Sequence, residues 1–585
     1  MITHTRTNLA LIRLCIVLLT YGPLIEAALL LILCTLPSVP SRTLPWLALP
    51  PSLRPALPFF RRALAALLAL EAAFYLAVYR RHAARLRATA ARHPNPPARA
   101  EREALFERCV RNVPDWDRFL RLWFQGAERA EVRRENVREW LGWAFWGRDV
   151  AGAGAGAGGF RDDVRVGEGE GEGEGEGEGG DGDGDGDGGG GEVQVEEEME
   201  EEMESYLRRI EARLGRALPP GRGNATALRL TLDPVEVRYR SVVWYGVVAA
   251  VDLVTHFVLC CRKGFTHYAP HPRVKSFPPR VAIPLVQPGR HRSSSQEIGY
   301  YFREHRSGRH LPVVFIHGIG IGMWPYREFL GELATRNEDV GILALELLPF
   351  SARLTSPPHS PQSLLKHIAA ILAHHGEQWE RFVLVAHSYG SVVATHMLRS
   401  QELGHRVRGL VLIDPVSLLL HLPDVAYNFT RREPATANEW QLWYFASMEL
   451  GVAEGLGRHF FWSENIIWRE ELLHFGRRSG EAGQALEDGS GSGAEKRKVA
   501  VCLCERDIIV DTRTVARYLV CDGDKIWLEL EEAFKSVPGA LTDRSTPSGL
   551  EVLWFPHLDH AQVFEDKNDR KRVINVISRF CRKQT

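Results

Sequence analysis

Residues 382–399 read FVLVAHSYGSVVATHMLR, and this stretch decides the fold of the chain. The apolar, β-prone run 382–387 is followed at once by Ser388 and then by a run typical of a helix. A serine on a sharp strand-to-helix turn needs small residues two positions away on each side, because larger side chains would collide. Ala386 and Gly390 meet this need. The pattern predicts that the Ser388 hydroxyl projects from a sheet edge, at a helix N-terminus that stabilises negative charge.

Short apolar runs of the same kind recur along the C-terminal half of the chain, separated by helical stretches. They occupy residues 312–317, 341–348, 407–414, 499–504 and 550–555. Strands that are apolar along their whole length are typical of a parallel sheet covered by helices on both faces. We therefore predict an α/β domain with a mostly parallel sheet flanked by helices.

This arrangement of strands, helices and the Ser388 turn resembles the α/β-hydrolase superfamily. The resemblance covers about half of the chain and implies the α/β-hydrolase fold for residues 280–585. Members of the superfamily carry a lid where this chain has an insertion, so a helical cap is expected at about residues 417–497. Its many aromatic residues either line an apolar acyl pocket or pack the cap onto the core. The insertion also resembles fungal membrane-anchored α/β-hydrolase-fold proteins, to which no substrate is assigned.

The resemblance also implies how the site would hold an oxyanion. The His317-Gly318 pair ends an early strand, where an HG motif supplies one backbone donor and the residue after the nucleophile supplies the other. In this chain the donors would be the N–H groups of Ile319 (or Gly320) and Tyr389. The His317 side chain itself is expected to make structural hydrogen bonds.

The acid and the base should follow Ser388 in the order Ser, Asp, His. Asp507 stands in the usual acid position after the run 499–504. Asp414 and, more weakly, Asp511 are the alternatives. His560 precedes a small residue that opens the last helix, as family members often show. His557 is the alternative base. In the triad His560 would take the Ser388 proton, and Asp507 would hold the imidazole and stabilise its charge.

These residues predict a serine hydrolase, esterase- or lipase-like, that acts on an apolar or lipid ester through an acyl-enzyme. The alternatives are a non-catalytic scaffold with the same fold and an acyltransferase that uses the same serine. Epoxide hydrolases and dehalogenases use Asp where this chain has Ser388. No cofactor is expected. No metal site is expected either, because His374 and His375 are adjacent and H-E-x-x-H is absent.

The N-terminal region contains segments apolar enough for a membrane. Residues 14–36 and 63–79 form two apolar runs, so residues 1–80 are predicted to be an anchor of two transmembrane helices. Arginines follow the second run, and the positive-inside tendency therefore places the C-terminal hydrolase domain of this multi-pass chain in the cytosol. A third apolar run, 242–260, indicates either an interfacial or membrane-embedded helix or a plain core helix.

The remaining segments divide by composition. Residues 81–150 have the apolar spacing of amphipathic helices. Residues 151–204, rich in Gly, Glu and Asp, have little to bury and are predicted to be a disordered linker. Residues 205–279 are expected to be a helical or interfacial connection. The net charge is −1, and the strongly acidic block would repel phosphates, so no nucleic-acid partner is expected.

Overall fold

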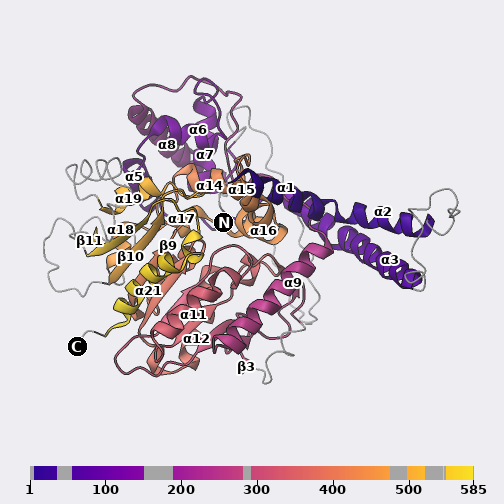
Figure 1. Ribbon diagram of the computed structural model, residues 1–585. Coiled ribbons are helices and arrows are strands. Elements are labelled where there is room, and N and C mark those ends of the chain that lie inside the picture. Colours follow the sequence, from indigo (N-terminus) through magenta and orange to yellow (C-terminus); the bar gives the residue numbers. More distant parts are fainter. Residues whose placement is uncertain are drawn as a thin grey trace, which may run out of the picture. The chain divides into compact units, whose positions relative to one another are not determined.

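A large sheet organises the C-terminal part of the chain (Figure 1). The computed structural model describes residues 5–35, 56–150, 189–280, 291–474, 497–520, 544–545 and 549–583. Within these residues the sheet has ten strands in the order β11-β12-β10-β9-β8-β5-β6-β4-β1-β3. The strands are β1 (Thr266–Ala269), β3 (His291–Arg292), β4 (Tyr300–Arg303), β5 (Val313–Ile316), β6 (Ile342–Leu345), β8 (Phe382–His387), β9 (Val407–Ile413), β10 (Lys498–Cys504), β11 (Arg544–Ser545) and β12 (Leu550–Phe555). A separate pair is formed by β2 (Ser276–Phe277) and β7 (Leu354–Thr355).

The six strands from β12 to β6 run parallel, while β4 and β11 are antiparallel to their neighbours. These six parallel strands are the ones that the apolar runs predict, with bounds that differ by at most three residues. The mostly parallel α/β sheet expected from the sequence is therefore confirmed. Because the strands are buried on both faces, their apolar side chains need no polar alternation.

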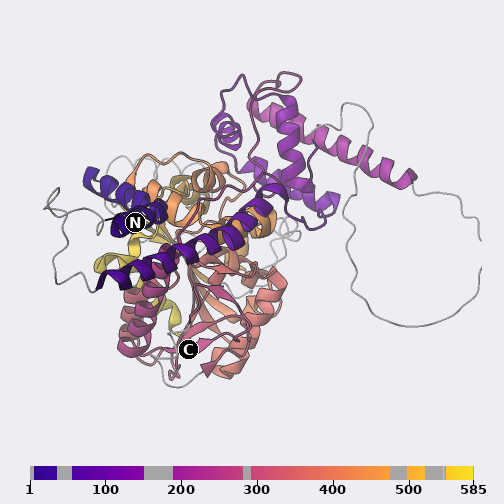
Figure 2. The same ribbon diagram turned by 90° about the vertical axis from the view of Figure 1, so that its right-hand side faces the viewer.

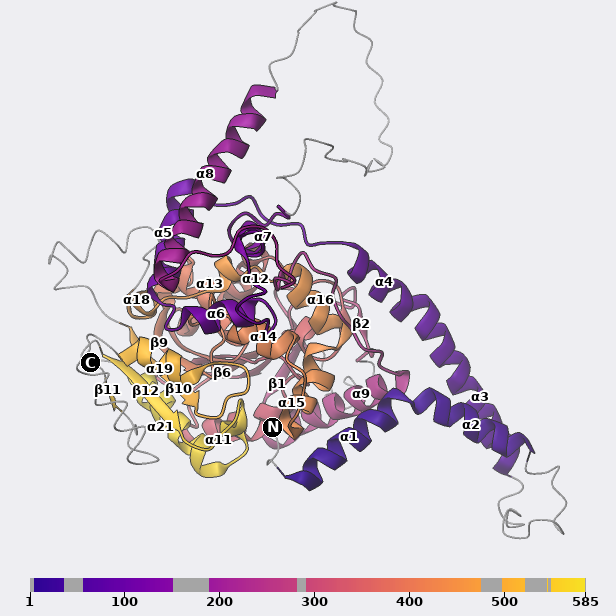
Figure 3. The same ribbon diagram turned by 90° about the horizontal axis from the view of Figure 1, so that it is seen from above.

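Helices cover both faces of the sheet (Figure 3). On one face α11 (Arg327–Arg336) and α21 (Lys567–Cys581) pack together and bury Phe329 and Phe580 against the strands. On the other face lie α12 (Pro361–His374) and α13 (Gly390–Arg399). Helix α19 (Thr512–Val520) packs on β10 and β12. The shorter helical turns are η7 (Trp324–Tyr326), η8 (Leu348–Phe350), η9 (Glu377–Trp379), η10 (Gly404–Arg406) and η12 (Gln562–Phe564).

The insertion after β9 is helical, as expected for a cap. Its elements are α14 (Pro423–Thr430), α15 (Ala437–Leu442), η11 (Trp443–Ser447), α16 (Leu450–His459), α17 (Trp462–Asn465) and α18 (Arg469–Leu473). The aromatic residues in the first half of the insertion mostly pack against neighbouring helices. Tyr444 is buried in a cluster with Ile16 and Trp244, and Trp440 and Trp443 border the same cluster. Residues 475–496 of the predicted cap lie outside the described residues.

The first apolar run is not one straight helix. It is divided into α1 (Arg6–Thr20) and α2 (Gly22–Thr35), which meet at an angle of 64°. The proline at position 23 explains the break, since a proline inside a helix lacks an N–H and its ring clashes with the preceding turn. The apolar run 14–36 is thus a bent pair of helices, and whether the pair forms one membrane span stays a prediction.

The second apolar run lies inside one continuous helix. It is built from α3 (Leu57–Phe74), the π-helical turn η4 (Tyr75–Tyr79) and α4 (Arg80–Ala88) (Figure 2). Together with α9 (Val242–Phe257) and its extension η6 (Val258–Arg262), this gives two helices long and apolar enough to cross a membrane. The bent pair α1 and α2 adds a third if it acts as one span. Helices α2 and α3 run side by side, and Arg61 Nε donates to the carbonyl oxygen of Leu33 at 2.8 Å.

The chain forms two compact units. One contains Met1–His93, Glu107–Pro114 and Leu230–Thr585, and the other contains Pro94–Phe106 and Asp115–Arg229. The second unit includes α6 (Trp116–Trp123), α7 (Arg134–Leu141), η5 (Gly142–Trp146) and α8 (Gly189–Leu214), and α5 (Arg99–Arg111) enters both units.

Helix α8 covers part of the segment predicted to be a disordered linker. Residues 151–188 of that segment lie outside the described residues, but the structure is helical from Gly189 onward. Tyr206 stacks on Phe106 with ring centroids 3.9 Å apart, and Met203 and Ile210 are buried on the same face of the helix. These apolar residues lie on one face of a helix whose other positions are rich in glutamate, and their burial stabilises the helix at the end of the acidic segment.

A buried cluster of charges ties α9 to the edge of the sheet. Arg280 makes a two-pronged contact with Glu346, at 2.8 and 2.9 Å, and also binds Asp252 of α9 at 3.0 Å. Arg353 reaches the same Asp252 at 2.9 Å, and His267 of β1 reaches Glu346 at 2.8 Å. Burial alone would raise the pKa of Glu346, but Arg280 and His267 hold it well below its usual range, so this carboxylate stays ionised.

We expect Arg280→Met to lower the stability of the protein by about 3–5 kcal/mol, because it leaves the buried Glu346 and the partly buried Asp252 without their shared partner. Thermal unfolding of the detergent-solubilised chain measures the effect. Arg306→Met is the matched control, since Arg306 and its partner Glu304 are exposed and such a pair contributes at most about 1 kcal/mol. Equal melting temperatures for the two variants would contradict this account of the charge cluster.

Candidate active site

Ser388 lies on the sharp turn between β8 and α13. Its backbone is left-handed, with φ of 51°, a conformation that is unfavourable for residues other than glycine. Neighbouring elements hold it there: the Ser388 N–H donates to the Ile413 carbonyl at 2.9 Å, and Ser391 Oγ donates to the Ser388 carbonyl at 2.7 Å. The turn is therefore fixed by β9 on one side and by the first turn of α13 on the other.

Two glycines allow the backbone to approach this turn closely. A Cβ atom on Gly390 would lie 2.6 Å from the carbonyl oxygen of Ile316, and one on Gly318 would lie 2.7 Å from Ser388 Cβ. Neither contact is sterically possible, so both positions require glycine. The sequence analysis explained the small residue at position 390 by crowding within the turn. The structure adds a second reason, because Gly390 also lies against the backbone at the end of β5.

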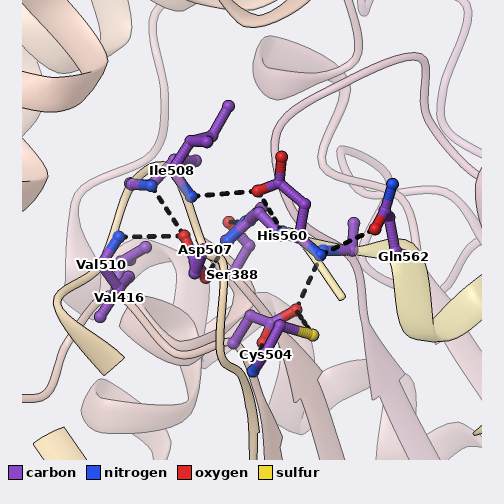
Figure 4. A network of polar contacts seen from close by, with 12 residues as sticks. Ser388, Val416, Cys504, Asp507, Ile508, Val510, His560 and Gln562 are labelled. Atoms are coloured by element: carbon purple, nitrogen blue, oxygen red, sulfur yellow. Dashed lines mark hydrogen bonds and ion pairs between the residues drawn. The ribbon is translucent and has the colours of Figure 1, made fainter. Parts of the chain in front are cut away.

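The structure brings Ser388, His560 and Asp507 together in one row (Figure 4). His560 Nε2 lies 2.9 Å from Ser388 Oγ, and His560 Nδ1 lies 2.7 Å from Asp507 Oδ2. Both distances are those of ordinary hydrogen bonds. Ser388 and His560 retain only 6% and 5% of their surface exposure, so both groups are largely withdrawn from bulk water.

Asp507 is oriented by the backbone that follows β10. Its Oδ1 atom accepts hydrogen bonds from the N–H groups of Ile509 at 2.7 Å and Val510 at 3.0 Å. The other oxygen is thereby left to His560. Asp511, the weakest of the acid candidates, instead accepts from the Thr514 N–H at 3.1 Å in the first turn of α19.

Asp414 lies in the same site but holds backbone instead of the imidazole. Its two oxygens accept from the N–H of Cys504 at 3.0 Å and from the N–H of Ala561, next to His560, at 2.9 Å. Burial and the nearby Asp507 raise the pKa of Asp414 above its usual range. Of the two main acid candidates, it is therefore Asp507 that contacts the ring of His560.

Asp559 is a third carboxylate at the site, and the sequence analysis did not single it out. Its Oδ1 atom accepts from the N–H groups of His560 at 2.7 Å and Ile508 at 3.0 Å, so it joins the histidine loop to the acid loop. Its Oδ2 atom accepts from Asn438 of the cap at 2.7 Å. Nothing in the sequence identifies this role except that Asp559 is adjacent to His560.

His557, the alternative base, points away from Ser388. Its backbone has φ of 73°, its side chain is exposed, and Nδ1 lies 3.1 Å from Arg506 Nη2. Only His560 of the two candidates therefore reaches the serine.

The ligand atoms of Asp414, Asp507 and His560 lie within 4.8 Å of one another, close enough to surround a metal ion. Both ring nitrogens of His560 are already within hydrogen-bond distance of protein groups, Ser388 Oγ and Asp507 Oδ2. The geometry of this cluster is thus accounted for by hydrogen bonding within the site.

Comparison with known proteins adds the family. A model of the alpha/beta hydrolase family matches residues 313–570, a range that contains Ser388, Asp507 and His560. Together with the mostly parallel sheet, this match shows that the domain has the α/β-hydrolase fold. Among curated proteins no match is found for the chain.

Several solved structures are similar to the hydrolase domain. A bacterial membrane phospholipase A is 14% identical, over 57% of this chain and 91% of that one, with a TM-score of 0.32. Naproxen esterase from Bacillus subtilis is 11% identical, over 57% of this chain and 97% of that one, with a TM-score of 0.32. A carboxyl esterase from the mycorrhizal fungus Tuber melanosporum is 14% identical, over 54% and 86%, with a TM-score of 0.30.

The loop after β5 lies beside the serine of the hydrolase domain, where an oxyanion would form. The Gly320 N–H already donates to the Phe350 carbonyl at 3.1 Å. Within the residues that the structure describes, the N–H groups of Ile319 and Tyr389 have no acceptor. Ile319, and not Gly320, therefore remains the expected partner of Tyr389.

Two residues that the sequence analysis did not single out hold this loop in place. The Tyr326 hydroxyl accepts from the Gly318 N–H at 3.1 Å and forms a hydrogen bond with His387 Nδ1 at 2.8 Å. His317 plays the structural part expected of it, because its Nε2 accepts from the Leu347 N–H at 2.9 Å. A tyrosine eight residues beyond the HG pair gives no local signal of such a contact.

A cavity of about 640 Å³ opens next to the serine turn of the hydrolase domain. Tyr389 belongs to its wall, whereas Ser388 is not among the described residues that line it. Its apolar lining includes Leu347, Leu348, Phe350, Val392, Val393 and Phe461. This volume lies within the range of roughly 300–1,000 Å³ that is usual for small-molecule sites.

The carboxylates of the site change the protonation of His560. Burial by itself lowers the pKa of His560, but Asp507, then Asp414 and Asp559, outweigh it and raise that pKa to about 9. The imidazole is therefore mostly protonated at neutral pH. Since only the neutral ring can accept a proton from Ser388, reactions of this serine should accelerate as the pH rises towards 9.

The rise of the reaction rate with pH is the acid limb of the pH–rate profile. We expect Asp507→Asn to shift this limb to lower pH, because the strongest source of the raised pKa of His560 is lost. The same change should slow the reaction by about 10⁴-fold. Asp414→Asn should shift the limb in the same direction by less and keep most of the rate. The measurement is the rate of fluorophosphonate labelling as a function of pH. Asp511→Asn is the control, and a limb that moved equally in all three variants would contradict the assignment.

Proposed function

We propose that the chain is a membrane-tethered serine hydrolase that cleaves an apolar or lipid carboxylic ester. The observation that carries the proposal is the row of hydrogen bonds from Ser388 Oγ through the His560 ring to Asp507. A serine, a base within reach of it and an acid on the far side of the base form the arrangement that activates a hydroxyl as a nucleophile.

In this mechanism Ser388 Oγ attacks the ester carbonyl while His560 Nε2 takes its proton. Asp507 accepts the hydrogen bond from Nδ1, which keeps the lone pair of Nε2 on the serine and stabilises the imidazolium that forms. The negative oxygen of the tetrahedral intermediate is held by the N–H groups of Ile319 and Tyr389. Such donors contribute about 10²–10³ each to the rate, because they are in place before the charge develops.

The intermediate collapses when the alcohol leaves with the proton that His560 returns to it. Ser388 then carries the acyl group. A water molecule, deprotonated by His560, attacks this ester, a second oxyanion forms on the same donors, and the acid is released as Ser388 regains its proton. The high pKa of His560 stabilises the imidazolium that forms each time the ring takes a proton. The same high pKa slows the first step at low pH, because fewer molecules then have the neutral ring that accepts the Ser388 proton.

The preference for an apolar substrate rests on the cavity beside Tyr389. Its lining contains the six aliphatic and aromatic side chains already named, and the ring centroids of Phe350 and Tyr389 lie 3.9 Å apart in its wall, with the ring planes tilted by 33°. An acyl chain or another apolar group that fills this space would be withdrawn from water, which stabilises binding by about 25 cal/mol per Å² of apolar surface.

We expect Ser388→Ala to abolish fluorophosphonate labelling and to lower ester hydrolysis by up to about 10⁶-fold. His560→Ala should have a comparable effect, because it removes the base. His557→Ala, a matched change of an exposed histidine three residues away, should leave the rate within about twofold.

The assay uses ester series of increasing acyl length, with product analysis to separate hydrolysis from acyl transfer to an added alcohol. If Ser388→Ala were labelled and active like the unmodified protein, the serine mechanism would be wrong and the scaffold alternative would replace it.

The membrane part of the proposal rests on the apolar helices. In the helix Leu57–Ala88 only 11% of its most apolar stretch is buried within the protein, so most of that surface is available to lipid. Large apolar side chains are exposed along it, including Phe59 at 70% and Leu76 at 54%. Arg80, Arg81 and Arg87 follow the apolar part, and by the positive-inside tendency they favour a cytosolic hydrolase domain.

For α9 we favour a position along the membrane surface over a span. Its midpoint is held by the ion pairs of Asp252, and its N-terminus by Glu71, which accepts from the Val242 N–H at 2.8 Å. The sheet strand β1 follows only a few residues after η6. The N-terminus is thus joined to α3, whereas the middle and the C-terminus are held by the hydrolase domain. A helix held in this way can still present a stripe to lipid, and α9 exposes Val243, Val247, Val254 and Phe257.

We expect deletion of residues 1–80 to abolish carbonate-resistant membrane integration, leaving weaker peripheral binding through α9. In that truncated chain Val247→Asp with Val254→Asp should release the protein from vesicles, whereas Val247→Leu with Val254→Leu should not. Fluorophosphonate labelling checks that each variant is folded, because the deletion removes Ile16 and Phe74 from a buried cluster. A truncated chain that still resists carbonate would show that residues 242–262 span the membrane.

A further inference from the structure

Three potential metal ligands meet at the rim of the cavity, apart from Ser388 and its partners. Glu297 precedes β4, His359 precedes α12, and His367 lies on α12. One carboxylate oxygen and one nitrogen from each ring all lie within 4.8 Å of one another. The Glu297 Oε2 atom is 3.4 Å from His359 Nε2 and 3.9 Å from His367 Nε2, and the two rings lie 4.9 Å apart.

The orientation of the His359 ring suits it to metal binding. Its Nδ1 atom lies 3.5 Å from the Ser363 hydroxyl, which leaves Nε2 directed at Glu297. A metal-binding histidine commonly uses its second nitrogen for a hydrogen bond of this kind, which fixes the ring orientation.

The distances fit a small divalent ion after a modest contraction. Zinc–ligand bonds of about 2.0–2.2 Å in a tetrahedron place the ligand atoms roughly 3.4 Å apart. The widest separation allowed here, 4.8 Å, therefore has to shrink by at most about 1.4 Å. Glu297 is exposed and both histidines are half-buried, so rotations of these side chains can supply the change without moving the backbone.

We infer that Glu297, His359 and His367 form a Zn²⁺ site. Two histidines and one glutamate leave the fourth tetrahedral position for water or another ligand. The bound ion would join the loop before β4 to the start of α12, two segments far apart in the sequence. Glu297 and His359 also line the cavity that Tyr389 borders, so the ion would add a positive charge to the wall of the proposed substrate cavity.

The test is zinc binding to the full chain in detergent, purified through a tag without histidine and stripped of metal with a chelator. Isothermal titration with ZnCl₂ should give one site per chain, and Co²⁺ should give the visible absorption of a tetrahedral complex. The double variant His359→Ala with His367→Ala should weaken binding by at least about 100-fold, and Glu297→Gln should weaken it while preserving side-chain shape.

Two controls make the outcome specific. His374→Ala changes an exposed histidine on the same helix as His367 and should bind zinc normally. His560→Ala should also bind normally, because the ring of His560 belongs to the other cluster. Unchanged affinity in the double variant, or loss of the site only in His560→Ala, would overturn the inference. Neither result depends on esterase activity, so failure of the zinc site and failure of the proposed hydrolase mechanism are separately visible.

Discussion

The left-handed turn at Ser388 is the constraint on which the rest of the site depends. A residue with a side chain adopts this conformation only when surrounding contacts over-determine it. Here β9 supplies a carbonyl to the Ser388 N–H, Ser391 holds its carbonyl, and Gly318 and Gly390 permit backbone contact from β5. The same close approach places the loop 317–320 beside the hydroxyl, so one local requirement fixes both the proposed nucleophile and the expected oxyanion donors.

The other half of the site depends on three carboxylates that divide their work. Asp507 contacts the His560 ring, while Asp414 and Asp559 hold the backbone on either side of that ring. Each comes from a loop after a different strand, so the sheet must be complete before they converge. Their combined charge overcomes the burial of His560 and keeps its pKa high. Asn438 extends the arrangement to the cap, because its amide donates to Asp559.

Polar groups hold the apolar helices α3 and α9 to their neighbours in the fold. Glu71 and Asp252 interrupt runs that otherwise have the composition of membrane segments, and both have partners inside the protein: Glu71 accepts from the start of α9, and Asp252 pairs with Arg280 and Arg353. Asp252 therefore attaches α9 to the hydrolase domain, whereas Glu71 joins α3 to α9. Because these partners lie far away in the sequence, hydropathy along the chain shows each charge but not its partner.

The six parallel strands and the serine turn could be predicted from the residues alone, because apolar runs and turn chemistry are local properties of the chain. The resemblance to the superfamily implied the helical cap, and it narrowed the acid to Asp507, Asp414 or, more weakly, Asp511, and the base to His560 or His557. The tertiary structure was needed to show that His560 contacts Ser388 and that Asp507 contacts His560. Those choices depend on distances between residues far apart in sequence and on backbone angles such as the φ of 73° that turns His557 outward. The roles of Asp559 and Tyr326 were missed for the same reason.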